Sequence, residues 1–239
     1  MSSELVTATW GTVVLWATSG ALACFLALIM TAGSLSPHGA IRLVARAAVN
    51  LTRGVPTSLL VVSAGIIMIR LPTASQWPTL FPGTPVGFQH VALAIMLALA
   101  FGSAGHLSEI FRAARASLGD ARLDQARALG LSRVGRAALL ARESAAVALP
   151  ATGTRLVHHL HNTAFAALFP VTDLFGFVQQ QASATFRVAH FALVGSAVYV
   201  VLSGVIWLSF RGLEASMLHR VARRSKKRPR LPRPTAAGS

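Results

Sequence analysis

Charged side chains are scarce in this sequence. Only 12% of its 239 residues are Asp, Glu, Lys or Arg, whereas a soluble domain carries about 25%. Its single cysteine, Cys24, excludes a disulfide within the chain. Its only lysines, Lys226 and Lys227, lack the glycine-rich approach of a phosphate-binding loop. These absences argue against an ordinary soluble domain and against ATP hydrolysis by this chain alone.

Long apolar runs fill most of the chain instead. A helix needs about 20 mainly apolar residues to cross a bilayer. We identify five such runs, at 10–32, 55–71, 86–107, 145–170 and 190–212. A soluble core could explain one or two of them, but five predict an all-α membrane protein with about five transmembrane helices. We expect one transmembrane domain over 1–220, followed by a basic, disordered tail at 221–239.

The net charge of +15 could indicate a nucleic-acid-binding protein, but the distribution of the charge indicates membrane topology. Cytoplasmic loops of membrane proteins collect Lys and Arg. Nearly all basic residues here fall in 33–54, in 106–144 and in the tail from Arg211. An outside N-terminus with a cytoplasmic C-terminus places these three segments in the cytoplasm. We therefore expect that orientation and no nucleic-acid partner.

The segment 119–144 has helical patterning rather than loop composition. A short helix is predicted at 121–129, and Gly130 fits the left-handed position that ends such a helix. Ser132 fits the N-cap of a second helix, on which Val134, Ala137, Ala138 and Ala141 form one apolar stripe. Such a helix–Gly–helix pair could anchor at the membrane surface or dock a cytoplasmic protein. The pattern alone leaves both possibilities open.

The stretch DQARALGLS (124–132) resembles the EAA motif, the E-A-A-x-x-x-G segment of permease subunits in ABC importers. Asp124, Gln125 and Ala126 take the Glu-Ala-Ala positions, and Gly130 takes the Gly position. Other segments, in the same order, resemble the polar amino acid branch of histidine/glutamine/arginine type. They are TRGVP (52–56), SEIFRAARASL (108–118), HNTAFAALF (161–169), QASATFR (181–187) and RGLEASMLHR (211–220). The chain departs from the family pattern at Asp124, at Gln125, and at Arg142-Glu143, where Leu-Pro is usual.

This resemblance implies a transport subunit that is not itself an enzyme and carries no cofactor. ATP and Mg would be bound by separate ABC ATPase subunits. The other implied partners are a second permease subunit, identical or different, and an extracytoplasmic solute-binding protein. All would work at a bacterial cytoplasmic (inner) membrane. The residues expected to couple the chain to the ATPase are Asp124, Gln125, Ala126, Arg127, Gly130, Ser132, Arg133 and Arg136. A structural role is expected for the family motif residues Arg53, Gly54, Pro56, Glu109 and Arg112.

The fourth apolar run carries polar side chains that should not all face lipid. A charge at the bilayer centre costs about 2.5–3.5 kcal/mol on insertion scales, so such groups face a cavity or a partner. We expect the translocation path or a subunit interface to include Arg155, His158, His159, Asn162 and Thr163. The neighbouring histidines could suggest a metal site. However, adjacent helical positions point in different directions and no Cys or acid joins them, so no metal is expected.

Three other functions compete with the amino acid permease. A related importer could carry another small zwitterion, such as an opine or an ectoine-like solute. An intramembrane serine protease would need a glycine-rich serine motif, and no G-x-S-x-G occurs in the sequence. A membrane adaptor without transport activity would leave the polar fourth run unexplained.

Overall fold

The computed structural model describes residues 2–71 and 78–226. These residues form helices and connecting turns, with no β-strand among them, which confirms the all-α prediction. Within these described ranges, three helices are long and apolar enough to cross a membrane. They are α1 (Ser2–Ser34), α4 (Gln89–Ser117), which the 3-10 turn η1 (Val86–Phe88) extends at its start, and α8 (Val188–Lys226). The pair α2 (Gly39–Gly54) and α3 (Thr57–Ile69) adds a fourth crossing if both helices form one span.

The predicted span at 55–71 contains α3 and is preceded by a further helix, α2. Most of the predicted cytoplasmic loop at 33–54 is helical, and α2 meets α3 at a bend of 90°. Pro56 has no N–H to continue the helix and disfavours helical geometry in the residue before it. Val55 is accordingly extended, with φ −99° and ψ 126°. The bend therefore has a local cause in the Val55-Pro56 sequence.

The helix α6 (Arg133–Asn162) joins two elements that the sequence patterns separate. The predicted second helix of the cytoplasmic loop continues without interruption into the fourth apolar run. The run then ends as the 3-10 helix η2 (Thr163–Leu168) rather than as part of one helix to residue 170. Because its polar residues lower its hydropathy, α6 is not among the helices apolar enough to count as a crossing.

The last part of the chain is more helical than predicted. The helix α7 (Leu174–Thr185) lies between the predicted spans 145–170 and 190–212, and Asp173 caps its first N–H groups. The helix α8 runs through Lys226, into the predicted disordered tail at 221–239, because no proline or glycine interrupts 213–226. The remainder of that tail, 227–239, lies outside the described residues.

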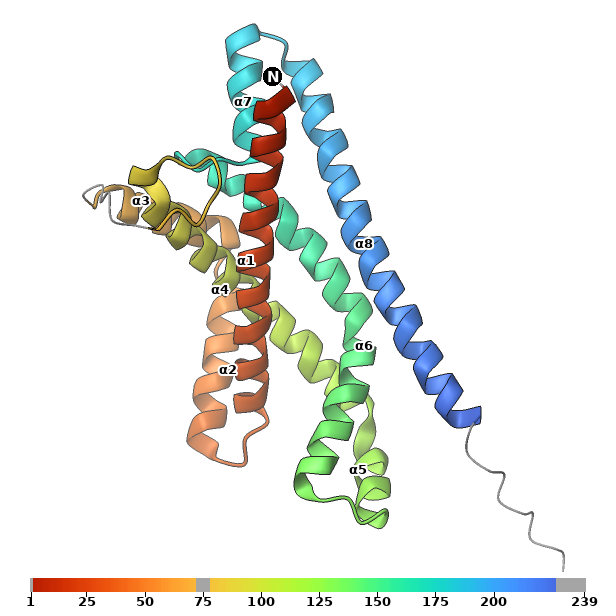
Figure 1. Ribbon diagram of the computed structural model, residues 1–239. Helices are drawn as coiled ribbons and strands as arrows, with labels where there is room; N and C mark the ends of the chain where they lie inside the picture. The colour runs from red at the N-terminus through yellow and green to blue at the C-terminus, as the bar shows by residue number, and fades with distance from the viewer. Residues whose placement is uncertain (1, 72–77, 227–239) are drawn as a thin grey trace, which may run out of the picture.

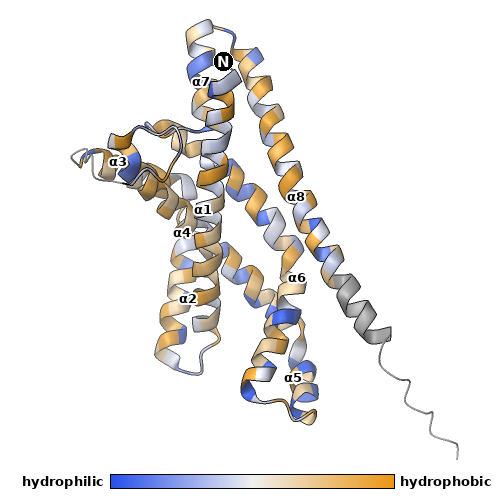
Figure 2. Ribbon diagram, in the orientation of Figure 1, coloured by the Kyte–Doolittle hydropathy of each residue, from blue (hydrophilic) through white to orange (hydrophobic). Residues whose placement is uncertain are grey.

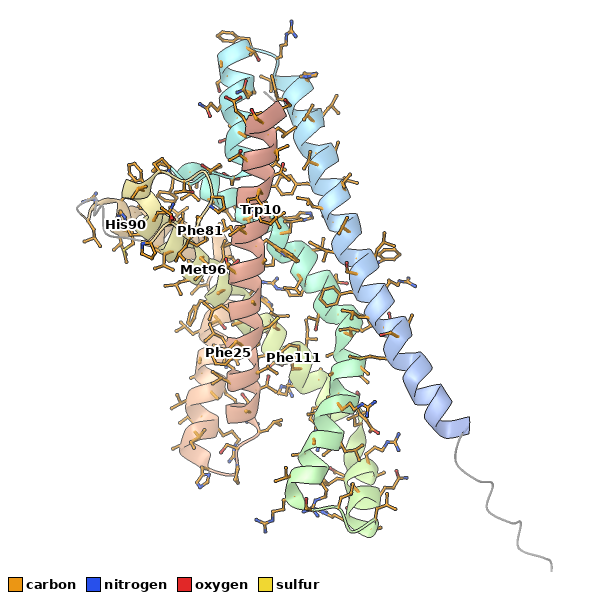
Figure 3. The ribbon with its side chains drawn as sticks, in the orientation of Figure 1. Trp10, Phe25, Phe81, His90, Met96 and Phe111 are labelled. Atoms are coloured by element: carbon orange, nitrogen blue, oxygen red, sulfur yellow. The ribbon has the colours of Figure 1, made fainter. Side chains whose placement is uncertain are left out.

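The main core lies where α1 and α3 pack against α4. Its fully buried side chains include Leu15, Val61, Ile95 and Leu99. Phe81, which precedes α4, and Met96 on α4 belong to the same cluster (Figure 3). Small residues on α1 let α4 approach closely, as is usual between membrane helices. By contrast, α8 stands to one side of the bundle with many exposed apolar residues, as Figure 2 shows.

Candidate functional site

The predicted coupling loop forms the end of the molecule farthest from the N-terminus (Figure 1). It consists of α5 (Gly119–Ala128), a tight turn, and the first part of α6. Its helix α5 packs mainly against α6. The loop therefore projects beyond the bundle formed by α1, α2 and α4, where a partner protein can reach it.

The turn between α5 and α6 has the predicted geometry. Gly130 has φ +70°, in the left-handed region that glycine adopts without strain. Its N–H donates to the carbonyl of Arg127 at 2.9 Å, and the N–H of Leu131 donates to the carbonyl of Ala126 at 3.2 Å. This pair of bonds is the Schellman arrangement that ends a helix. The Ser132 hydroxyl then accepts from a first-turn N–H of α6, so a helix, a glycine turn and a second helix follow one another here.

The predicted coupling side chains occupy different environments on this loop. Asp124 and Arg127 form an exposed ion pair at 3.0 Å. Ala126 is buried, Arg133 is exposed, and the Arg136 guanidinium donates to the carbonyl of Leu131 at 2.8 Å. Arg136 therefore stabilises the turn.

Gln125 and the unexpected Glu143 contact the same arginine. The side-chain amide oxygen of Gln125 accepts a hydrogen bond from Arg122 at 3.2 Å, and Arg122 also forms an ion pair with Glu143 at 3.3 Å. The ion pair joins α5 to α6, whereas the Gln125 contact lies within α5. Glu143 stands where the family usually has proline, so its role here is to hold the two helices of the loop together.

The tip of the loop also carries uncovered apolar side chains. Leu129 is 70% exposed and Val134 is 79% exposed, on either side of the Gly130 turn. Val134 belongs to the predicted apolar stripe, but sequence reasoning did not single out Leu129. Its position directly before the turn glycine was the available signal. Large apolar residues exposed together on a protruding tip are typical of a contact surface.

His159 lies at the centre of a buried hydrogen-bond chain between three helices. It is fully buried on α6; its Nε2 lies 2.8 Å from the Ser19 hydroxyl of α1, and its Nδ1 lies 2.8 Å from the Ser103 hydroxyl of α4. The Ser19 hydroxyl also reaches the carbonyl of Leu15, and Arg155 donates to the Ser103 oxygen at 3.3 Å.

One assignment of protons satisfies every bond in this chain. Arg155 donates to Ser103, Ser103 donates to Nδ1 of His159, Nε2–H donates to Ser19, and Ser19 donates to Leu15. His159 is then the neutral tautomer protonated at Nε2. Because both ring nitrogens are occupied, His159 joins helices rather than lining an open path.

The other polar residues of α6 point in several directions. Arg155 is half-buried, and its Nη2 lies 3.4 Å from the carbonyl of Gly102. Thr163 is buried and bonds to the carbonyl of Leu160, while Asn162 is partly exposed. The described residues contain no group of three or more His, Cys, Asp or Glu placed to hold a metal ion.

His158 and His161 lie towards α8. Both are exposed and line a pocket of about 520 Å³ between α6 and α8, together with Ser203 and Trp207. The His161 Nε2 lies 3.2 Å from the Ser203 hydroxyl. The structure thus separates His158 from the buried His159 that directly follows it.

The family motif residues lie at the α2–α3 bend and on α4. Gly54 and Pro56 flank the bend, and Arg53 precedes it. Glu109 accepts three hydrogen bonds from the Arg112 guanidinium, the shortest at 2.6 Å. That pair is partly exposed, so it contributes to local order more than to stability.

Comparison with known proteins gives relatives in sequence and in fold. The histidine/lysine/arginine/ornithine transport system permease protein HisM of Salmonella typhimurium is 27% identical over 82% of this chain and 83% of its own length. The arginine ABC transporter permease protein ArtM of Haemophilus influenzae is 25% identical, over 51% of this chain and about half (54%) of its own length. A crystal structure of an amino acid ABC transporter with histidines superposes with a TM-score of 0.72, at 19% identity, over 92% of this chain and 94% of that chain. No protein-family model matches the chain.

These findings confirm the resemblance carried by the sequence motifs. The chain is similar in sequence to permease proteins of amino acid ABC transporters and shares the fold of a chain from a solved one.

Proposed function

We propose that this chain is the membrane-spanning permease subunit of an ABC importer that moves a polar amino acid across a bacterial cytoplasmic membrane. The observation that carries this proposal is the exposed helix–Gly–helix loop at one end of a chain similar to amino acid permease proteins. The related proteins are named for histidine, lysine, arginine and ornithine. Another small zwitterion, such as an opine or an ectoine-like solute, is the second candidate cargo.

The coupling loop is the docking element for a separate ABC ATPase. Leu129 and Val134 provide apolar contact area at its tip, and Arg127 and Arg133 provide charge beside them. The same turn is formed or flanked by the other predicted coupling residues, Asp124, Gln125, Ala126, Gly130, Ser132 and Arg136. ATP and Mg are bound by the partner, and closure of the ATPase pair moves this loop. Such movement biases the permease between inward-open and outward-open states.

The N-terminus lies outside and the coupling loop lies in the cytoplasm, and this orientation sets where the remaining partners bind. A second permease subunit, identical or different, pairs with this chain, and a solute-binding protein delivers the cargo at the outer face. The translocation path runs along the α6 face that carries Arg155, His158 and Asn162. His159 and Thr163 support that face from the buried side of α6.

Gly130→Arg tests the docking assignment. The complete complex of permease, ATPase and solute-binding protein is reconstituted, and ATP hydrolysis is measured with and without liganded binding protein. An added side chain at Gly130 meets nothing within 4 Å inside the chain, so it extends towards the partner. We expect the stimulation of ATP hydrolysis, and uptake, to be lost.

Gly119→Arg is the matched control, because Gly119 also has a positive φ (+64°) and open space around it. It reports the effect of backbone strain at the other end of α5. Stimulation that survives Gly130→Arg contradicts the docking assignment. Equal loss in both variants would instead assign the effect to backbone strain.

A further inference from the structure

Three basic side chains lie at mid-span on α2, α4 and α6, where α4 packs against both of the other helices. Gly102, Ser103 and His106 lie near the middle of the candidate membrane span Val86–Ser117, and the α2–α3 bend lies near the middle of the second crossing. Arg155 reaches this level from α6 through its contacts with Gly102 and Ser103. We call Arg53, His106 and Arg155 the mid-span basic cluster.

Close packing holds the arginines of this cluster beside α4. A Cβ added to Gly105 would lie 3.1 Å from Cγ of Arg53, so that side chain runs directly over the glycine. His106, the next residue, interacts electrostatically with both Arg155 and Arg53. The guanidinium of Arg155 makes its two long contacts at 3.4 and 3.3 Å, while its buried Nε has no hydrogen-bond partner in the described part of the chain.

The first turn of α3 opens beside the same cluster. No side chain caps the start of this helix, and Pro56 precedes it. A Cβ added to Gly102 would lie 2.8 Å from Oγ1 of Thr57, so the first residue of α3 touches the glycine whose carbonyl faces Arg155. The N-terminus of a helix carries partial positive charge and free N–H groups, and broken helices at mid-membrane commonly present them to anionic substrate groups.

One carboxylate, that of Glu109, interacts electrostatically with Arg53, while Arg155 has no carboxylate within ion-pair distance in the described part of the chain. The sequence has only seven acidic residues. The nearest to the cluster along α4, Glu109, is already held by Arg112 at 2.6 Å. Glu4 and Asp173 lie towards the outer end, Asp120, Asp124 and Glu143 lie on or beside the coupling loop, and Glu214 lies on α8. Neither Arg53 nor Arg155 forms an ion pair among residues 2–71 and 78–226.

We propose that the mid-span basic cluster binds the carboxylate of the transported amino acid and rejects a cationic side chain, so that the cargo has a neutral or acidic side chain. This rests on the proposed importer function and narrows it. Two arginines and a helix N-terminus attract carboxylates, and an arginine or lysine substrate would bring a further positive charge to a site whose nearest carboxylate, Glu109, is already paired with Arg112. The named relatives carry such cationic amino acids, so this chain would differ from them in substrate.

The cluster lies on an open face of this subunit. Arg53 is exposed, and Arg155 and His106 are half-buried. The second permease subunit therefore closes the site and removes it from water, which strengthens the arginine–carboxylate contacts.

Direct binding to the complete permease–ATPase complex in lipid nanodiscs tests the proposal. The probes are L-glutamate, L-glutamine and L-arginine, measured by isothermal titration calorimetry without the solute-binding protein, so that only the membrane site selects. We expect glutamate or glutamine to bind at least tenfold more tightly than arginine. Preference for arginine, or binding of none of the three probes, overturns the proposal, and this comparison needs no variant.

Arg155→Gln then identifies the side chain responsible. We expect it to weaken binding of the preferred probe at least tenfold, while the control Arg187→Gln, at an exposed position before α8, changes binding less than twofold. An Arg155→Gln complex that assembles and binds within twofold of the wild type also overturns the proposal. Stimulation of ATP hydrolysis by liganded binding protein is measured separately. If ATP hydrolysis is stimulated but the membrane site prefers arginine, the importer function is supported and the proposed substrate class is refuted.

Discussion

Replacing Ser19 with alanine tests the hydrogen-bond chain around His159. The Ser19 hydroxyl is fully buried and lies 2.8 Å from the Nε2 of His159. Alanine removes the acceptor of that N–H and leaves a buried donor without this partner. The other ring nitrogen keeps its bond to Ser103, so the substitution isolates one link between α1 and α6.

The expected loss of stability depends on whether hydrogen-bond energies from soluble proteins or from membrane proteins apply. In soluble proteins a buried donor left unsatisfied costs about 1–3 kcal/mol. Side-chain hydrogen bonds between membrane helices average about 0.6 kcal/mol and reach about 1.7. Because this bond joins helices inside a membrane bundle, we use the second range. A chain of this size loses about 2–4 °C of Tm per kcal/mol, so Ser19→Ala should lower Tm by about 1–7 °C.

Thermal unfolding of the purified chain in detergent, followed by intrinsic fluorescence, measures this shift. Ser209→Ala is the matched control, because its exposed hydroxyl bonds only within α8. The background His159→Phe provides a double-mutant cycle, since no imidazole N–H is then present for Ser19→Ala to leave without its acceptor. Ser19→Ala should cost less there than in the wild type. Equal shifts for Ser19→Ala and Ser209→Ala would refute the hydrogen-bond chain.

Two further predictions concern packing and pH. Gly105→Ala forces a methyl group against Thr52 and the Arg53 side chain. This overpacking should lower the free energy of unfolding by about 1–3 kcal/mol. The control Gly212→Ala in α8, where an added methyl group has nothing within 4 Å, should leave Tm unchanged. Burial raises the pKa of Asp173, which lies outside the membrane-spanning segments, to about 7, although backbone N–H groups of α7 oppose the shift. As pH rises, this carboxyl therefore ionises at lower pH in the unfolded chain than in the folded one, so Tm should fall between about pH 4 and pH 7. Asp173→Asn should remove that part of the fall. Identical profiles of Tm against pH for the two proteins would contradict the prediction.

Local chemistry made part of the structure predictable from sequence. Gly130 and Ser132 end one helix and begin the next through bonds to residues within five positions, and both were predicted correctly. The order of six weak motifs along the chain identified the class of protein because each constrains a different segment. Neither inference required knowledge of long-range contacts.

The features that could not be predicted from the sequence depend mainly on long-range contacts. Pro56 marked a break, but the 90° bend also depends on Gly102 and Gly105 of α4, which leave room for α2 and α3. His159 looked like a path residue until its partners, Ser19 and Ser103, came from helices far away in sequence. The continuity of α6 was hidden because its polar residues suggested two separate elements.

That continuity gives α6 the character of a lever. The distance from Arg133 at the docking end to Arg155 at mid-span is about 33 Å along one helix, at 1.5 Å per residue. A tilt of about 5° at one end thus displaces the other by about 3 Å, comparable to the length of a hydrogen bond. The one proline in α6, Pro150, lies between the two ends, where a missing N–H makes bending easiest. Mechanical work done at the coupling loop therefore reaches Arg155 through a single helix, and the stiffness of α6 around Pro150 sets how much of that movement arrives.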